Sequence, residues 1–148
     1  MQWIIKPFYD LTLDELYAIL KLRAEVFVVE QTCIYNDIDD LDKKGIHVFA
    51  VDGDAIAGYA RVLPANTRFK TPSIGRVVTN KVNRSMGIGA ELMTKSIELI
   101  KTTWAEELIT ISAQEHLEKF YNSLGFVRAS EVYMEDGIPH IKMTYSGK

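Results

Sequence analysis

Arg84-Ser85-Met86-Gly87-Ile88-Gly89-Ala90 joins two segments that differ in hydrophobic periodicity. Residues 73–79 before it are rich in β-branched side chains, as in a buried strand, and residues 87–104 after it carry apolar side chains at helical spacing. The two glycines allow the backbone to approach a ligand closely, and the unpaired amides of a first helical turn direct the positive end of the helix dipole outward. This junction therefore predicts a strand, a loop able to hold a diphosphate, and a long helix.

Two other phosphate-binding motifs do not match this loop. No Gly-Lys-Ser/Thr follows it, as a Walker loop requires, and the dinucleotide fingerprint needs Gly-x-Gly-x-x-Gly after the first strand of a wound sheet. Glycines also serve ordinary tight turns, so the loop sequence by itself leaves a structural turn and a phosphate site as equal alternatives.

The segments downstream of the loop extend the same sheet. Residues 108–113 have the pattern of a buried strand, so strand, helix and strand across residues 73–113 have the length of a right-handed crossover between parallel neighbours. A second helix follows, with Gly125 at the expected left-handed C-cap. Its apolar stripe at i, i+3, i+4 and i+7 consists of Leu117, Phe120, Tyr121 and Leu124.

Two hairpins flank this unit. Residues 47–51 and 55–63 surround one glycine-containing turn, and residues 126–134 and 138–145 surround another. Hairpins are antiparallel, whereas the crossover is parallel, so the sheet is expected to be mixed.

The N-terminal segment adds a strand and a helix. Residues 3–8 predict the strand, and Thr12 followed three residues later by Glu15 is a capping box that starts the helix. The buried face of this helix is expected to contain Leu13, Leu16, Tyr17, Leu20, Ala24, Phe27 and Val28. Together the segments predict an α/β fold with a mixed central sheet of about seven strands and about four flanking helices.

The composition is that of one globular domain. The 148 residues are 47% hydrophobic and 25% charged, with a formal net charge of -3, and no repeat or linker interrupts them, so we expect a single domain over residues 1–148. This mild acidity does not fit the basic surface that nucleic acids require. No apolar run approaches the roughly 20 residues that span a bilayer, and the first residues lack a signal-peptide pattern. With the single cysteine Cys33, these features predict a cytoplasmic protein without nucleic-acid or membrane partners.

Several motifs, in the same order along the chain, resemble the GCN5-related N-acetyltransferase (GNAT) superfamily. They are Arg76-Val77-Val78-Thr79, then Arg84-x-x-Gly87-x-Gly89, then a strand that ends near Ala113, and then Phe120-Tyr121-x-x-x-Gly125-Phe126. A further run resembles the ElaA-like branch of the superfamily, and it reads Leu22-Arg23-x-x-Val26-Phe27-Val28-Val29-Glu30-Gln31-x-Cys33-x-Tyr35. The resemblance extends from Trp3 to Tyr145.

The resemblance implies an acetyl-CoA-dependent N-acetyltransferase, without a metal, whose sheet opens between the strands at 73–79 and 108–113. The backbone of Val77, Val78 and Thr79 would pair with the pantetheine arm and hold the thioester carbonyl. Gln114 stands where many members have an asparagine that contacts the cofactor. The pyrophosphate would bind the loop amides of Arg84, Ser85, Met86, Gly87, Ile88, Gly89 and Ala90.

Tyr121 matches the tyrosine of the family that protonates the departing thiolate. Acyl transfer needs donors where negative charge develops and an acid near the leaving sulfur, which is the chemistry these positions would supply. Spacing alone favours a different interpretation, in which Tyr121 is a core aromatic on the apolar stripe of its helix.

An attacking amine must lose a proton, so a base or a water relay is expected near the thioester. The candidates are Glu30 in the ElaA-like run, His140 on the last hairpin, and His47 at the start of a strand. An exposed glutamate at a helix end and surface histidines are the ordinary alternatives. The acceptor is expected to be an amine of a small molecule or peptide.

An acidic segment contains Asp37, Asp39, Asp40 and Asp42 and would favour a cationic acceptor, with a solvated loop as the alternative. It is not a calcium loop, because Leu41 stands where an oxygen ligand is needed and Asp42 where a glycine is needed. Cys33 is interpreted as a packing residue, since no activating partner is near it in the sequence.

Two functions remain open from the sequence. One is an N-acetyltransferase, and the other is a non-catalytic acyl-CoA-binding sensor or interaction module that uses the same cleft. Tyr133 and Tyr145, which are expected to be exposed on the closing hairpin, are candidates for a homodimer surface.

Overall fold

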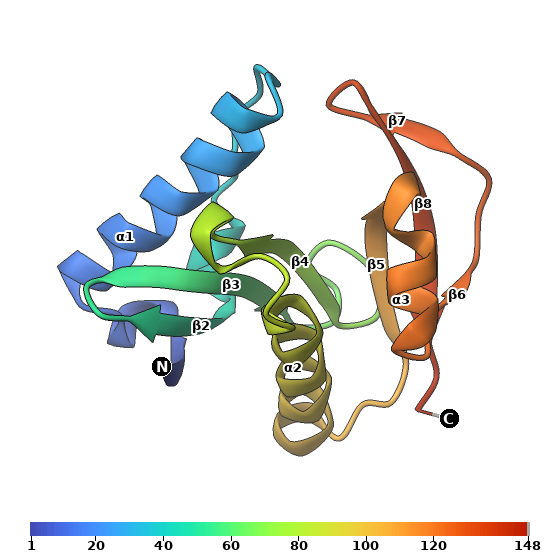
Figure 1. Ribbon diagram of the computed structural model, residues 1–148. Coiled ribbons are helices and arrows are strands. Elements are labelled where there is room, and N and C mark those ends of the chain that lie inside the picture. Colours follow the sequence, from blue (N-terminus) through green and yellow to red (C-terminus); the bar gives the residue numbers. More distant parts are fainter. Residues whose placement is uncertain (148) are drawn as a thin grey trace.

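The computed structural model describes residues 1–147, which form a mixed sheet of eight strands and three α-helices (Figure 1). The shorter turns include the π-helical turn η2 (Ala24–Glu30) and the 3-10 turns η3 (Leu41–Lys44) and η5 (Glu115–Leu117). The main elements in chain order are β1 (Gln2–Pro7), α1 (Leu13–Arg23), β2 (Ile46–Asp52), β3 (Ala55–Leu63), β4 (Ser73–Thr79), α2 (Ile88–Trp104), β5 (Ile109–Gln114), α3 (Glu118–Ser123), β6 (Val127–Arg128), β7 (Tyr133–Glu135) and β8 (Ile138–Tyr145).

The sheet divides in its middle. Its order is β1-β2-β3-β4-β5-β8-β6, and β7 also pairs with β8. All neighbours are antiparallel except β4 and β5, which are parallel and meet through the single register pair Ser73↔Thr110 among the described residues. Beyond that pair the two halves diverge, with α1 and η2 rising on one side and the β7–β8 hairpin on the other (Figure 1). The predicted mixed sheet and its parallel crossover are confirmed.

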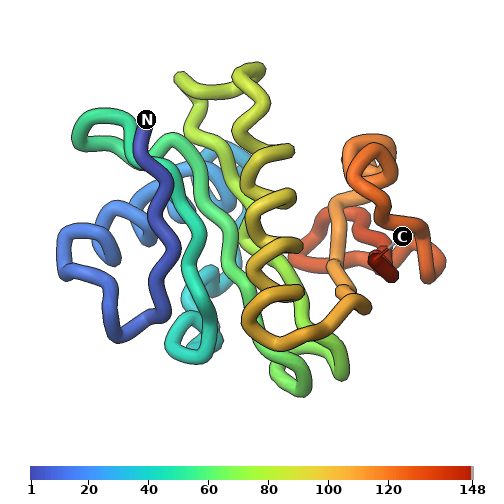
Figure 2. The backbone as a smooth tube through the Cα atoms, turned by 90° about the horizontal axis from the view of Figure 1, so that it is seen from below, coloured from blue at the N-terminus to red at the C-terminus, as the bar shows by residue number. Residues whose placement is uncertain are grey.

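The helices α1 and α2 cover opposite faces of the first half of the sheet. Val48 and Ala50 of β2 belong to the core that α2 covers, whereas Phe49 between them packs with Ile19 and Leu22 of α1. This alternation follows from the two-residue period of a strand. Figure 2 shows α2 in yellow lying across the strands while α1 in blue passes behind them.

The predicted buried face of the first helix is wrong at Leu13, Tyr17 and Ala24, although Phe27 packs against the core as predicted. Leu13 and Tyr17 are 86% and 74% exposed, and the buried apolar side chains are instead Ile19, Leu22 and Val26. The capping box at Thr12 and Glu15 forms as predicted, but it lies at the solvent-facing start of the helix. Only the second half of α1 packs on the sheet, and its continuation into the wider π-helical turn changes which side chains face inward.

The last hairpin is also more divided than predicted. The run 126–134 contains two short strands, β6 and β7, which pair with opposite ends of β8. Between them the Ser130 hydroxyl accepts a hydrogen bond from the amide of Lys142 at 2.8 Å. This interruption accounts for the eighth strand. Tyr133 and Tyr145 are half-buried rather than exposed.

Candidate active site

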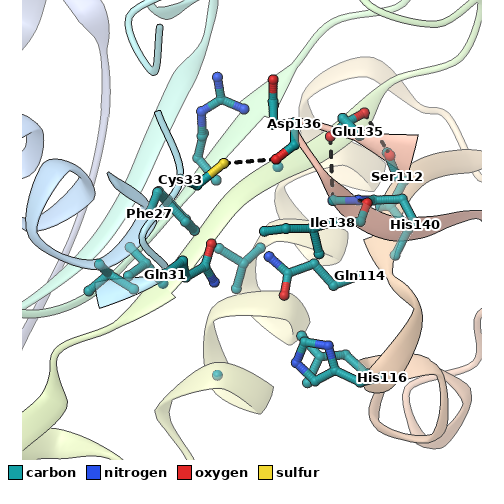
Figure 3. Close-up of a pocket in the computed structure, with 18 of the residues that line it drawn as sticks. Phe27, Gln31, Cys33, Ser112, Gln114, His116, Glu135, Asp136, Ile138 and His140 are labelled. Carbon is teal, nitrogen blue, oxygen red and sulfur yellow. Dashed lines mark hydrogen bonds and ion pairs between the residues drawn. The ribbon is translucent and has the colours of Figure 1, made fainter. Parts of the chain in front are cut away.

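A cleft of about 540 Å³ lies where the two halves of the sheet separate. Its walls come from η2 and β4 on one side and from β5, α3 and the β7–β8 hairpin on the other. Figure 3 labels lining side chains from η2, β5 and the hairpin. Strands that diverge leave backbone groups without a strand partner, so this cleft combines apolar walls with free amides and carbonyls.

A β-bulge directs the backbone of β4 into the cleft. Pairing with β3 steps from Tyr59↔Val78 to Arg61↔Gly75, so Arg76 and Val77 together oppose one residue of β3. Arg76 has a φ of +51°, the left-handed conformation that an inserted residue requires here. Gly75 to Thr79 all line the cleft, and the bulge changes the direction in which their peptide groups point.

The loop before α2 presents an open helix N-terminus. Gly87, the N-cap, has a φ of +76°, and no side chain caps the first turn. Ile88 is buried and fixes the start of the helix against β3, because Gly58 there leaves room for its side chain. Gly89 lines the cleft beside Phe120. The first-turn amides are therefore free to donate hydrogen bonds to an anion.

The end of α3 holds Tyr121 in the cleft wall. Gly125 has a φ of +100° and donates to the carbonyl of Asn122, and the amide of Phe126 donates to the carbonyl of Tyr121, both at 3.1 Å. This is the Schellman arrangement expected from a glycine C-cap. The Tyr121 ring packs edge-on against Phe120 and Phe126, and burial raises the pKa of its hydroxyl to about 12. The hydroxyl therefore keeps its proton at neutral pH.

Glu30 and Arg84 form an ion pair at the rim of the cleft. Glu30 ends η2, and its carboxylate lies 2.8 Å from the Arg84 guanidinium of the loop before α2. Hydrogen bonding to Arg84 lowers the pKa of Glu30, which makes it a weaker base. Both side chains are half-exposed.

His140 lies in the cleft beside an acidic residue that the sequence analysis did not select. Its Nε2 is 3.5 Å from the carboxylate of Glu135 (Figure 3), and its ring stacks on Tyr133. The Glu135 carboxylate also accepts from Arg68 at 2.6 Å and from the Ser112 hydroxyl at 3.1 Å. The cleft therefore contains a connected set of ionisable and hydroxyl groups.

His47 is outside the cleft lining and has a structural environment. Its Nε2 lies 2.9 Å from the carbonyl of Asp42, so this nitrogen donates, and its Nδ1 accepts from the Tyr59 hydroxyl at 2.6 Å. Burial lowers the pKa of His47. With both nitrogens engaged in a neutral ring, His47 has no site left to act as a base.

The acidic segment is neither a solvated loop nor a wall that attracts cations. The Arg23 guanidinium donates to Asp37 at 2.8 Å and to Asp42 at 2.7 Å, and all three residues are buried. Arg61 donates to both carboxylate oxygens of Asp39. Arginines thus neutralise Asp37, Asp39 and Asp42, whereas Asp40 is exposed, so the expectation that the segment selects a cationic acceptor is wrong.

Most of the predicted site residues line this one cleft. They are Glu30, Val77, Val78, Thr79, Arg84, Gly89, Gln114, Tyr121 and His140. Ser85, Met86, Gly87, Ile88 and Ala90 lie on the adjoining loop and first turn of α2 without lining it.

Several lining residues were not among the predicted site residues, and the polar ones include Arg68, Ser112, His116 and Glu135. Glu135 belongs to a turn motif that indicated only a hairpin, and Ser112 belongs to a strand whose apolar pattern indicated only burial. The hydrogen bond between Ser112 and Glu135 depends on tertiary structure, since the two residues lie on separate strands, β5 and β7. No cluster of His, Cys, Asp or Glu suited to a metal ion was found within residues 1–147.

Besides the Arg68–Glu135 pair, a further contact joins the two walls of the cleft. The thiol of Cys33, in the segment after η2, donates to the carbonyl of Asp136 in the β7–β8 turn at 2.8 Å (Figure 3). These residues are 103 positions apart in the sequence. Their contact limits the opening between the N-terminal segment and the closing hairpin.

No helix within the described part of the chain has the length and apolar character needed to cross a membrane.

Comparison with known proteins agrees with this architecture. Residues 14–146 match the family described as acetyltransferase (GNAT) domain. Protein ElaA of Escherichia coli is 40% identical over 145 residues, which cover 97% of this chain and 95% of ElaA. The crystal structure of Escherichia coli ElaA superposes with a TM-score of 0.91 over 97% of this chain and 98% of that one, at 38% identity.

Two further structures extend the comparison. An acyl-CoA N-acyltransferase from Pseudomonas aeruginosa has a TM-score of 0.92 and 41% identity, covering 98% of this chain and 99% of that one. An aminoglycoside 6'-N-acetyltransferase complexed with coenzyme A has a TM-score of 0.74 at 17% identity, covering 98% and 97%, and shares the fold. The chain belongs to the GNAT family of acetyltransferases, in the branch that includes ElaA.

Proposed function

We propose that this chain is a single N-acetyltransferase domain that moves an acetyl group from acetyl-CoA to an amine of a small molecule or peptide. The observation that carries the proposal is the divided sheet, in which bulged β4 and Tyr121 line one cleft. The transfer would be a direct attack in a ternary complex, with the cofactor along β4 and the amine near His140 on the other wall.

The residues present fit an acyl-CoA. Beyond Ser73 the edge of β4 toward β5 has no strand partner, so an extended chain carrying amides can add to Val77, Val78 and Thr79 as a strand would. The uncapped amides of the loop from Arg84 to Ala90 suit a pyrophosphate. Gln114, at the end of β5, extends into the cleft from the other wall (Figure 3). A coenzyme A complex of a protein with the same fold is consistent with this choice of ligand.

Three groups would carry the chemistry. The amides of Val77 and Val78 would hold the thioester oxygen as negative charge develops on it. Tyr121, protonated because burial raises its pKa to about 12, would protonate the departing thiolate. His140 is the preferred base, because the other candidate, Glu30, is paired with Arg84 and has a lowered pKa.

Calorimetry and thiol release test the proposal together. We expect acetyl-CoA to bind and a panel of small amines and peptides to include at least one acceptor that releases free thiol. Binding without release for any acceptor would support the non-catalytic sensor instead. A protein that does not bind acetyl-CoA at all would contradict both functions.

A further inference from the structure

Glu135 is the most connected acidic residue of the cleft, and neither the family motifs nor the proposed function uses it. It ends β7, with its side chain 28% exposed. One of its oxygens, Oε1, accepts from Arg68 Nη2 at 2.6 Å and from Ser112 Oγ at 3.1 Å. The other oxygen, Oε2, faces His140 Nε2 at 3.5 Å (Figure 3).

The orientation of this carboxylate is fixed by its neighbours. The Tyr133 hydroxyl lies 2.6 Å from Ser112 Oγ, and because Ser112 donates to Glu135, Tyr133 donates to Ser112. A chain of hydrogen bonds therefore runs from Tyr133 through Ser112 to Oε1, and Arg68 reaches the same oxygen from the segment between β3 and β4. This arrangement leaves Oε2 for His140.

The tautomer of His140 follows from its other contact. Its Nδ1 lies 2.7 Å from the carbonyl of Ile138, and since a carbonyl only accepts, Nδ1 carries the hydrogen. In the neutral ring the lone pair is then on Nε2. The Glu135 carboxylate lies 3.5 Å from that nitrogen, a distance at which its negative charge would attract an imidazolium.

We propose that Glu135 is a positioning residue for acetyl transfer, which holds His140 so that Nε2 receives the proton lost by the amine and stabilises the resulting imidazolium. This inference rests on the proposed function. As the amine nitrogen bonds to the thioester carbon, the carbon–sulfur bond breaks and the sulfur takes the proton of Tyr121. The amine proton passes to His140, and exchange with water then returns both residues to their neutral forms.

A kinetic double-mutant cycle tests the link between the two residues. We expect His140→Ala to lower kcat by about 100-fold or more and Glu135→Gln by about tenfold, with little change in the KM for acetyl-CoA. The double variant should be no slower than His140→Ala, since Glu135 would act only through the imidazole. Equal losses from Glu135→Gln in both backgrounds, or a Glu135→Gln enzyme as fast as the wild type, would overturn the inference.

Further measurements separate this role from a structural one. Glu131→Gln is the matched control, because Glu131 is exposed on the loop before β7 and does not line the cleft, and it should leave kcat unchanged. Glu135→Asp keeps the charge and should recover part of the rate that Glu135→Gln loses. Added imidazole should restore activity to His140→Ala. If Glu135→Gln lowers the melting temperature and its kcat falls only to the extent that the protein is unfolded, the role of Glu135 is structural and the inference is contradicted.

The outcomes also distinguish this inference from the proposed function. If the wild-type enzyme releases no thiol with any amine, the proposed function fails and Glu135 loses its role with it. If the wild type is active and Glu135→Gln matches it, only the inference fails.

Discussion

Arg84 forms a two-point ion pair with Glu30, with Nη1 2.8 Å from Oε2 and Nη2 3.1 Å from Oε1. The pair joins the loop proposed to bind pyrophosphate to the end of η2, across the rim of the cleft. A bound pyrophosphate would therefore compete with Glu30 for the same guanidinium. In the free enzyme, the Glu30 carboxylate holds the Arg84 guanidinium in place and partly neutralises its charge.

The first prediction is that Glu30→Gln binds coenzyme A more tightly. Glu30→Gln frees Arg84 from this competitor, and because an exposed ion pair is weak, we expect the Kd to fall by about two- to fivefold. Calorimetry at low salt measures this change, and added salt should reduce it by screening. Glu25→Gln, exposed on the same turn, is the control and should leave the Kd unchanged. Equal or weaker binding by Glu30→Gln would show that Glu30 does not compete.

The second prediction concerns Tyr121. Tyr121→Phe keeps the ring and its packing but removes the proton donor, so kcat should fall by roughly 100-fold or more while coenzyme A affinity stays close to that of the wild type. Thiol release with the best acceptor and calorimetry measure the two quantities. Tyr17→Phe, which is 74% exposed on α1, should change neither. Full activity in Tyr121→Phe would exclude this residue as the acid.

Local sequence signals predicted the secondary structure around the proposed cofactor loop well, because those signals are short-range. The capping box at Thr12, the glycine C-cap at Gly125 and the strand–loop–helix around Gly87 each depend on residues within a few positions of one another. The positions of the elements followed from these signals and from periodicity. The resemblance to a family then connected them to acyl-CoA.

The acceptor half was not predictable in the same way. Asp37 and Asp42 were interpreted from their own segment as a charged surface, but their partners Arg23 and Arg61 lie on α1 and β3. Likewise, Glu135 meets Arg68 across 67 positions of sequence. Such pairs depend on how the chain folds back on itself, and no periodic pattern in a single sequence encodes them.

The third prediction is that Asp42→Asn destabilises the protein strongly. The substitution keeps the shape but leaves the buried Arg23 and Arg61 short of negative charge, and breaking a buried pair costs about 3–5 kcal/mol. Urea unfolding measures this loss. Asp40→Asn, exposed in the same segment, should lie within about 0.5 kcal/mol of the wild type. Similar losses in both variants would show that the segment, rather than the buried charge, matters.

The fourth prediction is a loss of stability in acid. Burial by itself raises the pKa of Asp42, but the hydrogen bonds and charges of Arg23 and Arg61 outweigh it and hold the pKa below its ordinary value of 3.8. The unfolded chain then binds a proton before the folded one does, so this stabilisation is complete above about pH 5 and is lost as the pH falls through the folded pKa. Unfolding free energies from pH 6 downward should fall less steeply in Asp42→Asn than in the wild type. Parallel curves would contradict this assignment.

The last prediction joins the core to the cofactor loop. A Cβ at Gly58 of β3 would lie 2.6 Å from Ile88 Cγ2 and 3.0 Å from Leu92 Cδ1, so Gly58→Ala must displace the start of α2. We expect a loss of about 1–3 kcal/mol in unfolding free energy together with weaker coenzyme A binding, because the first-turn amides move with Ile88.

Two comparison variants show whether this loss comes from that steric contact. Gly75→Ala on β4 meets no atom within 4 Å and should cost little stability. Replacing Ile88 by alanine makes room for the new methyl, so the double variant Gly58→Ala with Ile88→Ala should be more stable than the sum of the two single losses predicts. Strictly additive losses would mean that the Gly58–Ile88 approach does not set the position of the helix. A non-additive result would show that the close packing of β3 against α2 fixes the loop proposed to hold the pyrophosphate.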